Sequence, residues 1–112
     1  MVLASGKVGH EAKARRDELG INNVAIVRVE QLYPWPADDV AAALAPFTNA
    51  TEFVWLQEEP ENMGAWPFVH LRTLGGPQVL RHVARAESAS PATGSGLVHA
   101  AEQADLFVRA LQ

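Results

Sequence analysis

The residues best able to do acid–base chemistry form the run Gln57-Glu58-Glu59-Pro60-Glu61-Asn62. Two carboxyl groups can divide the roles of general acid and general base when their surroundings separate their pKa values. Glu58 and Glu59 are sequence neighbours, however, and neighbours in an extended segment point to opposite sides. A carboxylate here can instead favour a helix N-terminus or pair with an arginine, and Asn62 is a good capping residue. The pattern favours a structural or interface role for Gln57, Glu58, Glu59 and Asn62, and a hydrolase using Glu58 or Glu59 is the remoter alternative.

A second group lies nearer the C-terminus and has the composition of an anion-binding loop. Arg85 is followed by small and hydroxyl-bearing residues that precede a predicted helix, namely Ser88, Ser90, Thr93, Gly94 and Ser95. Backbone amides at a helix N-terminus, together with a guanidinium group, can bind an anion. The same small residues would also let a neighbouring chain approach closely. Both interpretations of this loop stay open.

The turn Ser5-Gly6-Lys7 resembles a phosphate-binding loop only superficially. A P-loop requires two glycines separated by four residues, followed by lysine and then serine or threonine. The next residues, Val8 and Gly9, do not continue that pattern. We expect Gly6 to permit a tight turn from a strand into a helix, and Ser5 and Gly6 remain weak candidates for an anion contact.

The sequence offers no local pattern for a metal site or for a covalent nucleophile. Cysteine is absent, which excludes disulfides and thiolate ligands. The histidines show none of the short spacings of metal-binding motifs; they are His10, His70, His82 and His99. Gly94-Ser95-Gly96 lacks the flanking residues of a nucleophile elbow. We therefore predict no catalytic residue, metal or cofactor for this chain.

Alternating strands and helices must position these residues. Apolar runs and turn signals predict strands over 2–4, 24–29, 53–56 and 80–85, and helices over 7–19, 36–47, about 64–74 and 98–111. The alternation predicts an α/β domain with helices on both faces of a mostly parallel sheet, and the unbroken apolar run 24–29 favours a strand buried on both faces. Ligands bind such sheets at the carboxyl ends of the strands, so the segments 5–7, 31–34, 57–62 and 85–95 should share one rim.

Length and composition fit one domain spanning residues 1–112. The chain is 48% hydrophobic and has a formal net charge of −4. Its mild acidity provides no footprint for nonspecific nucleic-acid binding, and no apolar run reaches the roughly 18 residues of a spanning helix. We expect a cytoplasmic domain without a nucleic-acid or membrane partner.

Several motifs point together to one family. They are V-L-A-S-G-K-V at 2–8, V-R-V-E-Q-L-Y-P-W-P at 27–36, W-L-Q-E-E-P-E-N-M-G-A-W at 55–66, R-A-E-S-A-S-P-A-T-G-S at 85–95 and V-H-A-A-E-Q at 98–103. Over essentially its whole length, the chain resembles the carboxy-terminal domain of the thiamine-diphosphate-dependent decarboxylating component of 2-oxoglutarate dehydrogenase. That family includes the multifunctional 2-oxoglutarate decarboxylases.

The resemblance implies a transketolase carboxy-terminal-like fold, three-layered α/β/α, with a mixed sheet of five strands, one of them antiparallel. Four strands are predicted from the residues, so the fifth is expected upstream of Met1, in a larger parent subunit. In that parent, the upstream domains hold thiamine diphosphate and magnesium, decarboxylate 2-oxoglutarate and pass the succinyl group to a lipoyl-bearing acyltransferase. The present domain is implied to be an accessory and oligomerisation domain of a homodimer, without catalysis of its own.

The resemblance also raises an alternative, a regulatory module for acetyl-CoA or a nucleotide that uses Ser5, Gly6 and the loop 85–95. Acetyl-CoA activates some actinobacterial members of the family. Two departures weaken a phosphate contact: Leu97 stands where members often carry a basic residue, and Glu87 adds a negative charge. We further expect Trp35, Trp66 and the proline-marked rim to form an apolar surface that other domains of the parent cover.

Overall fold

The computed structural model of the chain describes residues 1–90 and 94–112. Strands and helices alternate along it, as β1 (Val2–Ala4), α1 (Lys7–Glu18), β2 (Ile26–Arg28), α2 (Ala37–Leu44), β3 (Phe53–Pro60), α3 (Trp66–Thr73), β4 (Leu80–Arg85) and α4 (Gly96–Leu111). The predicted order of elements is confirmed. Thr93, one of the candidate site residues, lies outside the described residues.

The strands form one sheet in the order β2-β1-β3-β4, and each of its pairings is parallel. In the central pair, Leu3 of β1 lies opposite Trp55 of β3. The predicted parallel sheet is thereby confirmed with four strands. An antiparallel strand is not among the residues that the structure describes.

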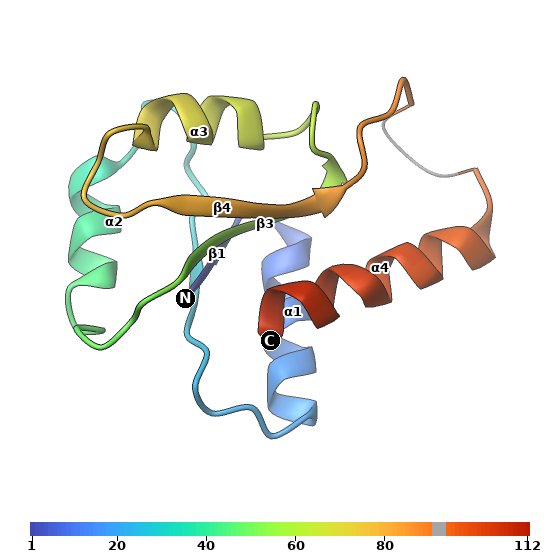
Figure 1. Cartoon of the computed structure of the whole chain (residues 1–112), viewed down its shortest axis with the longest axis horizontal. Coiled ribbons are helices and arrows are strands. Elements are labelled where there is room, and N and C mark those ends of the chain that lie inside the picture. Colours follow the sequence, from blue (N-terminus) through green and yellow to red (C-terminus); the bar gives the residue numbers. More distant parts are fainter. Residues whose placement is uncertain (91–93) are drawn as a thin grey trace.

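Helices cover both faces of the sheet and make three layers (Figure 1). Side chains alternate between the two faces of a strand, so neighbouring residues of β1 enter different cores. Val2 and Ala4 pack with α1 and α4, whereas Leu3 packs with α2 and α3. The three-layer α/β/α architecture predicted from the alternation of elements is confirmed.

The end of α1 shows how the chain is turned back into the sheet. Gly20 has a φ of 68°, and its amide donates to the carbonyl of Asp17 while the amide of Ile21 donates to that of Arg16, both at 3.1 Å. These two bonds make a Schellman motif, which favours glycine at the left-handed position. Ile21 then packs against the core beneath α1 and α4.

Two strands differ from their predicted form. β2 spans only residues 26–28, and the expectation that it is buried on both faces is wrong: Ile26 and Val27 are half-buried and Arg28 is exposed. The reason is its position at the edge of the sheet, where it pairs with β1 alone. β3 is longer than predicted and runs through the polar segment to Pro60, with Gln57 buried inside it. Within the described ranges, no helix is both long and apolar enough to cross a membrane.

Candidate functional site

Two of the predicted rim segments, those that follow β3 and β4, are joined by hydrogen bonds at the carboxyl edge of the sheet. The backbone amide of Glu61, after β3, donates to the carbonyl of Arg85 at the end of β4 at 2.8 Å. At the other side of the rim, the amide of Gly6 donates to Oε1 of Glu30 at 3.4 Å. Ser5 and Gly6 are half-buried at the turn into α1, as expected for a connection between strand and helix.

Gln57 organises the segment between β3 and α3 from a buried position, with only 3% of its surface exposed. Its Oε1 accepts hydrogen bonds from the indole Nε1 of Trp55 at 3.1 Å and from the backbone amide of Trp66 at 2.7 Å. Its Nε2 donates to the carbonyl of Met63 at 2.8 Å and to that of Pro60 at 2.9 Å. Gln57 thus satisfies the first amide of α3, whose own N-cap residue makes no side-chain bond.

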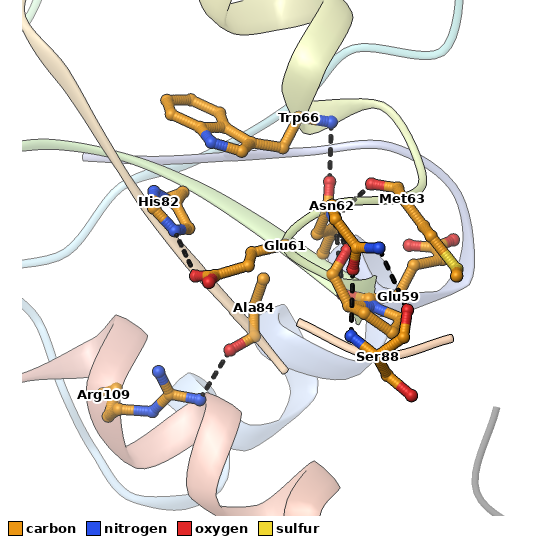
Figure 2. A network of polar contacts seen from close by, with 11 residues as sticks. Glu59, Glu61, Asn62, Met63, Trp66, His82, Ala84, Ser88 and Arg109 are labelled. Atoms are coloured by element: carbon orange, nitrogen blue, oxygen red, sulfur yellow. Dashed lines mark hydrogen bonds and ion pairs between the residues drawn. The ribbon is translucent and has the colours of Figure 1, made fainter. Parts of the chain in front are cut away.

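Asn62 pairs with the backbone of the next rim loop and does not cap a helix. Its Nδ2 donates to the carbonyl of Ser88 at 3.0 Å, and its Oδ1 accepts from the amide of Ser88 at 3.1 Å, as Figure 2 shows. The hydroxyl of Ser88 accepts in turn from the amide of Ser90 at 3.1 Å. The loops that follow β3 and β4 are therefore joined through one asparagine.

Glu58 and Glu59 are both half-buried in the last part of β3. The pairing of β3 with β4 is irregular between Leu56 and Pro60, so these two residues lie in a stretch where the alternation of a regular strand is interrupted. Glu59 lies against Gly64, where an added Cβ would come within 3.0 Å of both the Cβ and Oε2 of Glu59. This contact gives Glu59 a packing role in the turn before α3.

A cluster that the sequence did not reveal joins Glu61, His82 and Trp66 on this rim (Figure 2). Nε2 of His82 lies 3.0 Å from Oε2 of Glu61, and the His82 ring stacks on the Trp66 indole with centroids 4.8 Å apart. The ring of His70 also contacts the indole, with centroids 4.9 Å apart. The available signal was the alternation in β4, because Leu80 and His82 face the same side, towards α3.

Arg85 is bound by α4 and is only 8% exposed. Its Nη2 donates to Oε1 of Gln103 at 2.8 Å and lies 3.1 Å from Nδ1 of His99. Its Nε lies 3.1 Å from Oε2 of Glu102, close enough for an ion pair, but the N–H is not directed at that oxygen. Gln103 continues the network by donating to Glu11 of α1 at 3.1 Å. The guanidinium group therefore has internal partners on the helix that covers it.

Beside Arg85, a groove of about 800 Å³ separates the ends of β3 and β4 from α4. Its lining includes Arg85, Arg109, Ser88 and Ser90, together with four carboxylate residues: Glu61, Glu87, Glu102 and Asp105. Arg109 donates to the carbonyl of Ala84 at 2.9 Å, as Figure 2 shows. It also donates to Oδ2 of Asp105 at 2.8 Å. Four carboxylates against two guanidinium groups give the groove an acidic balance, which opposes an anion.

The last residue of the predicted anion-binding loop, Ser95, caps the N-terminus of the helix that follows. The hydroxyl of Ser95 accepts a hydrogen bond from the amide of Val98 at 3.4 Å and caps α4, and Gly94 before it is exposed. Among the described residues, no group of three or more His, Asp or Glu side chains could hold a metal ion. The structure thus joins Gln57, Asn62, Arg85 and Ser88 in rim contacts and leaves Ser5 and Gly6 at a separate turn.

A four-stranded parallel sheet between two helical layers, with a hydrogen-bonded polar rim at its carboxyl edge, defines a three-layer α/β/α domain. Residues 1–111 match the family model of the 2-oxoglutarate dehydrogenase C-terminal region, and the chain belongs to this family. The resemblance drawn from the sequence motifs is confirmed.

Individual relatives are similar over almost the entire chain. The 2-oxoglutarate dehydrogenase E1 component of Azotobacter vinelandii is 41% identical, and that of Cupriavidus necator is 42% identical, each over 96% of this chain. The multifunctional 2-oxoglutarate metabolism enzyme of Mycolicibacterium vanbaalenii is 41% identical over the same share. The matched region makes up 12%, 12% and 9% of these relatives, so the chain spans about a tenth of their length.

Proposed function

We propose that this chain acts as the accessory carboxy-terminal domain of a 2-oxoglutarate dehydrogenase E1-type subunit. The observation that carries the proposal is the match over residues 1–111, which corresponds to about a tenth of each relative. The parent subunit would be a cytoplasmic oxidoreductase of the tricarboxylic acid cycle. It would decarboxylate 2-oxoglutarate and pass the succinyl group to the lipoyl arm of a partner acyltransferase.

Within that parent, the domain packs on the upstream domains and contributes to a homodimer. The rim contacts support such a role, because Gln57, Asn62 and Arg85 are engaged with groups of the domain itself. A polar edge held in this way can present a fixed surface to a neighbouring domain. Interfaces between domains of one chain are typically more polar than obligate interfaces between subunits.

The described residues do not fit thiamine diphosphate with its magnesium ion. Magnesium is bound by oxygen ligands, yet the rim carboxylates Glu61 and Glu102 already face His82 and Arg85. We therefore assign the cofactor and the metal to the upstream domains of the parent, and we derive no chemical step from this chain.

A chimera of the Azotobacter vinelandii E1 component, with its matching C-terminal region replaced by this chain, tests the proposal. With thiamine diphosphate and magnesium, we expect the chimera to decarboxylate 2-oxoglutarate, while the same protein truncated before that region is inactive or unfolded. The 112-residue chain alone should show no turnover. Turnover by the chain alone, or full activity of the truncated protein, would contradict the assignment.

A second candidate function is the binding of acetyl-CoA or a nucleotide in the groove between β4 and α4. Its volume of about 800 Å³ is favourable, since ligand sites commonly measure about 300–1,000 Å³. The acidic balance of the lining is unfavourable for phosphates. Calorimetric titration of the chimera with acetyl-CoA and with AMP decides the matter, and the absence of heat for both would remove this candidate.

A further inference from the structure

Helix α3 carries large apolar side chains on its outer side as well as its inner side. Leu71 of α3 and its C-cap residue Leu74 are 72% and 68% exposed, whereas Val69 is fully buried between α3 and the sheet. The exposed positions of α1 are instead mostly charged, and include Lys7, Lys13, Arg15, Asp17 and Glu18. His70 and Arg72 are exposed on the same helix, so its outer side is mixed, and the two large exposed leucines within four residues mark it as an interaction surface.

The apolar surface extends from α3 onto the loop before α2. Tyr33 is 77% exposed, and its ring lies 6.4 Å from that of Phe68, between centroids. The guanidinium carbon of Arg72 lies 5.0 Å from the centroid of the same Phe68 ring. We call the surface formed by Tyr33, Phe68, Leu71, Arg72 and Leu74 the α3 face. It lies on the side of the sheet opposite α1 and α4 (Figure 1).

The α3 face adjoins an apolar cavity of about 170 Å³ between α2 and the end of α3. Arg72 forms part of its wall, together with Trp35, Val40, Leu44 and Leu80. An apolar cavity of roughly 150 Å³ accepts a benzene-sized group. One large apolar side chain of a partner could therefore enter it, in the way that interface anchors fill pockets.

The charge of the α3 face bears on whether its partner is a second copy of this chain or a different surface. Segment 62–79 contains no aspartate or glutamate, although the chain has 13 acidic residues, and Arg72 is its one arginine or lysine. Within the described part of the chain, Arg72 has no carboxylate partner. In a twofold dimer each copy presents the same patch, so two α3 faces would bring two arginines together without a carboxylate.

We propose that the α3 face packs against the remainder of the parent subunit, which supplies an apolar surface, one anchor for the cavity and a carboxylate for Arg72. The proposal rests on the proposed function, because the relatives extend over about eight to eleven times the matched length and thus provide the partner. It places the covered surface at Tyr33, Leu71 and Leu74. Trp35 and Trp66, expected in this role from the sequence, are half-buried and pack within the domain.

Hydroxyl-radical footprinting of the isolated chain and of the Azotobacter chimera tests this inference. We expect labelling of Tyr33, Leu71 and Leu74 to fall severalfold in the chimera. Leu19, the C-cap residue of α1, and Leu97 in α4 are 57% and 87% exposed, and their labelling should stay unchanged. Equal labelling of the α3 face in both proteins would overturn the inference, and activity of that same chimera would leave the proposed function standing.

Two matched variants supply a second measurement. In the chimera, Leu71→Glu should reduce 2-oxoglutarate decarboxylation and restore labelling of Tyr33 and Leu74. Leu97→Glu should alter neither, since it places a negative charge at the start of α4, where the helix dipole favours it. If the isolated chain forms a dimer that protects Tyr33 and Leu71, a second copy is the occupant and the proposal is wrong.

Discussion

At the scale of single residues, Gln57 joins three elements through one buried amide. Its side chain contacts the indole of Trp55, the first amide of α3 and carbonyls of the intervening turn. Leaving a buried polar group without a partner costs about 1–3 kcal/mol, more than the roughly 1 kcal/mol that a typical hydrogen bond contributes. The amide of Gln57 thus holds this turn by hydrogen bonds, whereas Glu59 packs against Gly64.

We predict that Gln57→Ala lowers the free energy of unfolding by about 2–4 kcal/mol, because it orphans a buried indole N–H, a helix amide and two carbonyls. Glu58→Ala, one residue further along β3, should change it by less than about 0.5 kcal/mol, as for sites without special contacts. Urea denaturation followed by circular dichroism measures both. Equal effects of the two substitutions would contradict the role given to Gln57.

Arg85 and Arg81 offer a matched pair, because both lie in β4 and both face a glutamate. Arg85 is 8% exposed beside Glu102, whereas the side chain of Arg81 is 43% exposed beside Glu52. We predict that Arg85→Ala lowers the free energy of unfolding by about 2–4 kcal/mol through the loss of buried charge-assisted bonds. Arg81→Ala should cost at most about 1 kcal/mol, as surface ion pairs do.

Chemical denaturation of the Arg85→Ala and Arg81→Ala variants in low and high salt measures these changes in the free energy of unfolding. The small effect of Arg81→Ala should shrink further in high salt because exposed charges are screened. The effect of Arg85→Ala should persist, since its partners Gln103 and His99 are held by packing of α4 on β4. A cost for Arg85→Ala that vanishes in salt would show that the guanidinium is not held internally.

The sequence identified the correct region at this scale but assigned some roles to the wrong atoms. From residue-type preferences, Asn62 was the expected helix cap. In the structure the side chain of Gln57 accepts the hydrogen bond from the first amide of α3, because β3 continues to Pro60 and places Gln57 beneath that helix. The link between Asn62 and Ser88 depends on two parallel strands ending side by side, which no local spacing reveals. The internal pairing of Arg85 likewise requires knowing that α4 lies across β4.

At the scale of elements, local signals were reliable where the chain turns sharply. The helix predicted over 7–19 ends at Glu18, because Gly20 supplies the left-handed residue needed there and glycine adopts it without strain. The lengths of β2 and β3 were not predictable, since they are set by neighbouring strands. β2 is short and half-exposed as an edge strand, whereas β3 is flanked on both sides.

Substitutions at two glycines in such turns can distinguish the energetic cost of a left-handed backbone from the cost of a side-chain clash. Gly20 and Gly64 have φ values of 68° and 63°, but an added Cβ meets nothing within 4 Å at Gly20 and meets Glu59 at 3.0 Å at Gly64. We predict that Gly20→Ala costs about 1 kcal/mol for the left-handed backbone alone. Gly64→Ala should cost about 2–3 kcal/mol because a side-chain clash is added.

The comparison is made by urea denaturation of both variants, together with Glu59→Ala and Glu59→Ala/Gly64→Ala. Shortening Glu59 removes its carboxylate but keeps its Cβ, so it should relieve only part of the additional cost. Strict additivity of Glu59→Ala and Gly64→Ala would show that the two side chains do not meet.

At the scale of the whole molecule, the alternation of elements determined the architecture. Four strand–helix units along 112 residues predict a parallel sheet with helices on both faces, and the structure has this arrangement. The covered surface of α3 was harder to foresee. The sequence shows Leu71 and Leu74 at helical spacing, but only the fold reveals that Val69 takes the inner side.

The two cores of the molecule share the strands β1 and β3, so we predict that residues 1–112 unfold as one cooperative unit. Trp35, Trp55 and Trp66 belong to the core beneath α2 and α3, and their fluorescence reports on that layer alone. Leu106 of α4 is fully buried in the opposite core. Circular dichroism is dominated by the longer helices α1 and α4, so the two probes observe different layers.

Leu106→Ala should lower the free energy of unfolding by about 3 kcal/mol, the usual cost of a cavity at a buried leucine. If the sheet couples the layers, the urea midpoint should fall equally by fluorescence and by circular dichroism, as two-state unfolding requires. Val108→Ala, at a half-exposed position of the same helix, serves as the control and should shift neither probe appreciably. A fluorescence transition that Leu106→Ala leaves in place would mean that the layer beneath α3 unfolds by itself. The chain would then comprise two units, contrary to the single domain inferred from its length.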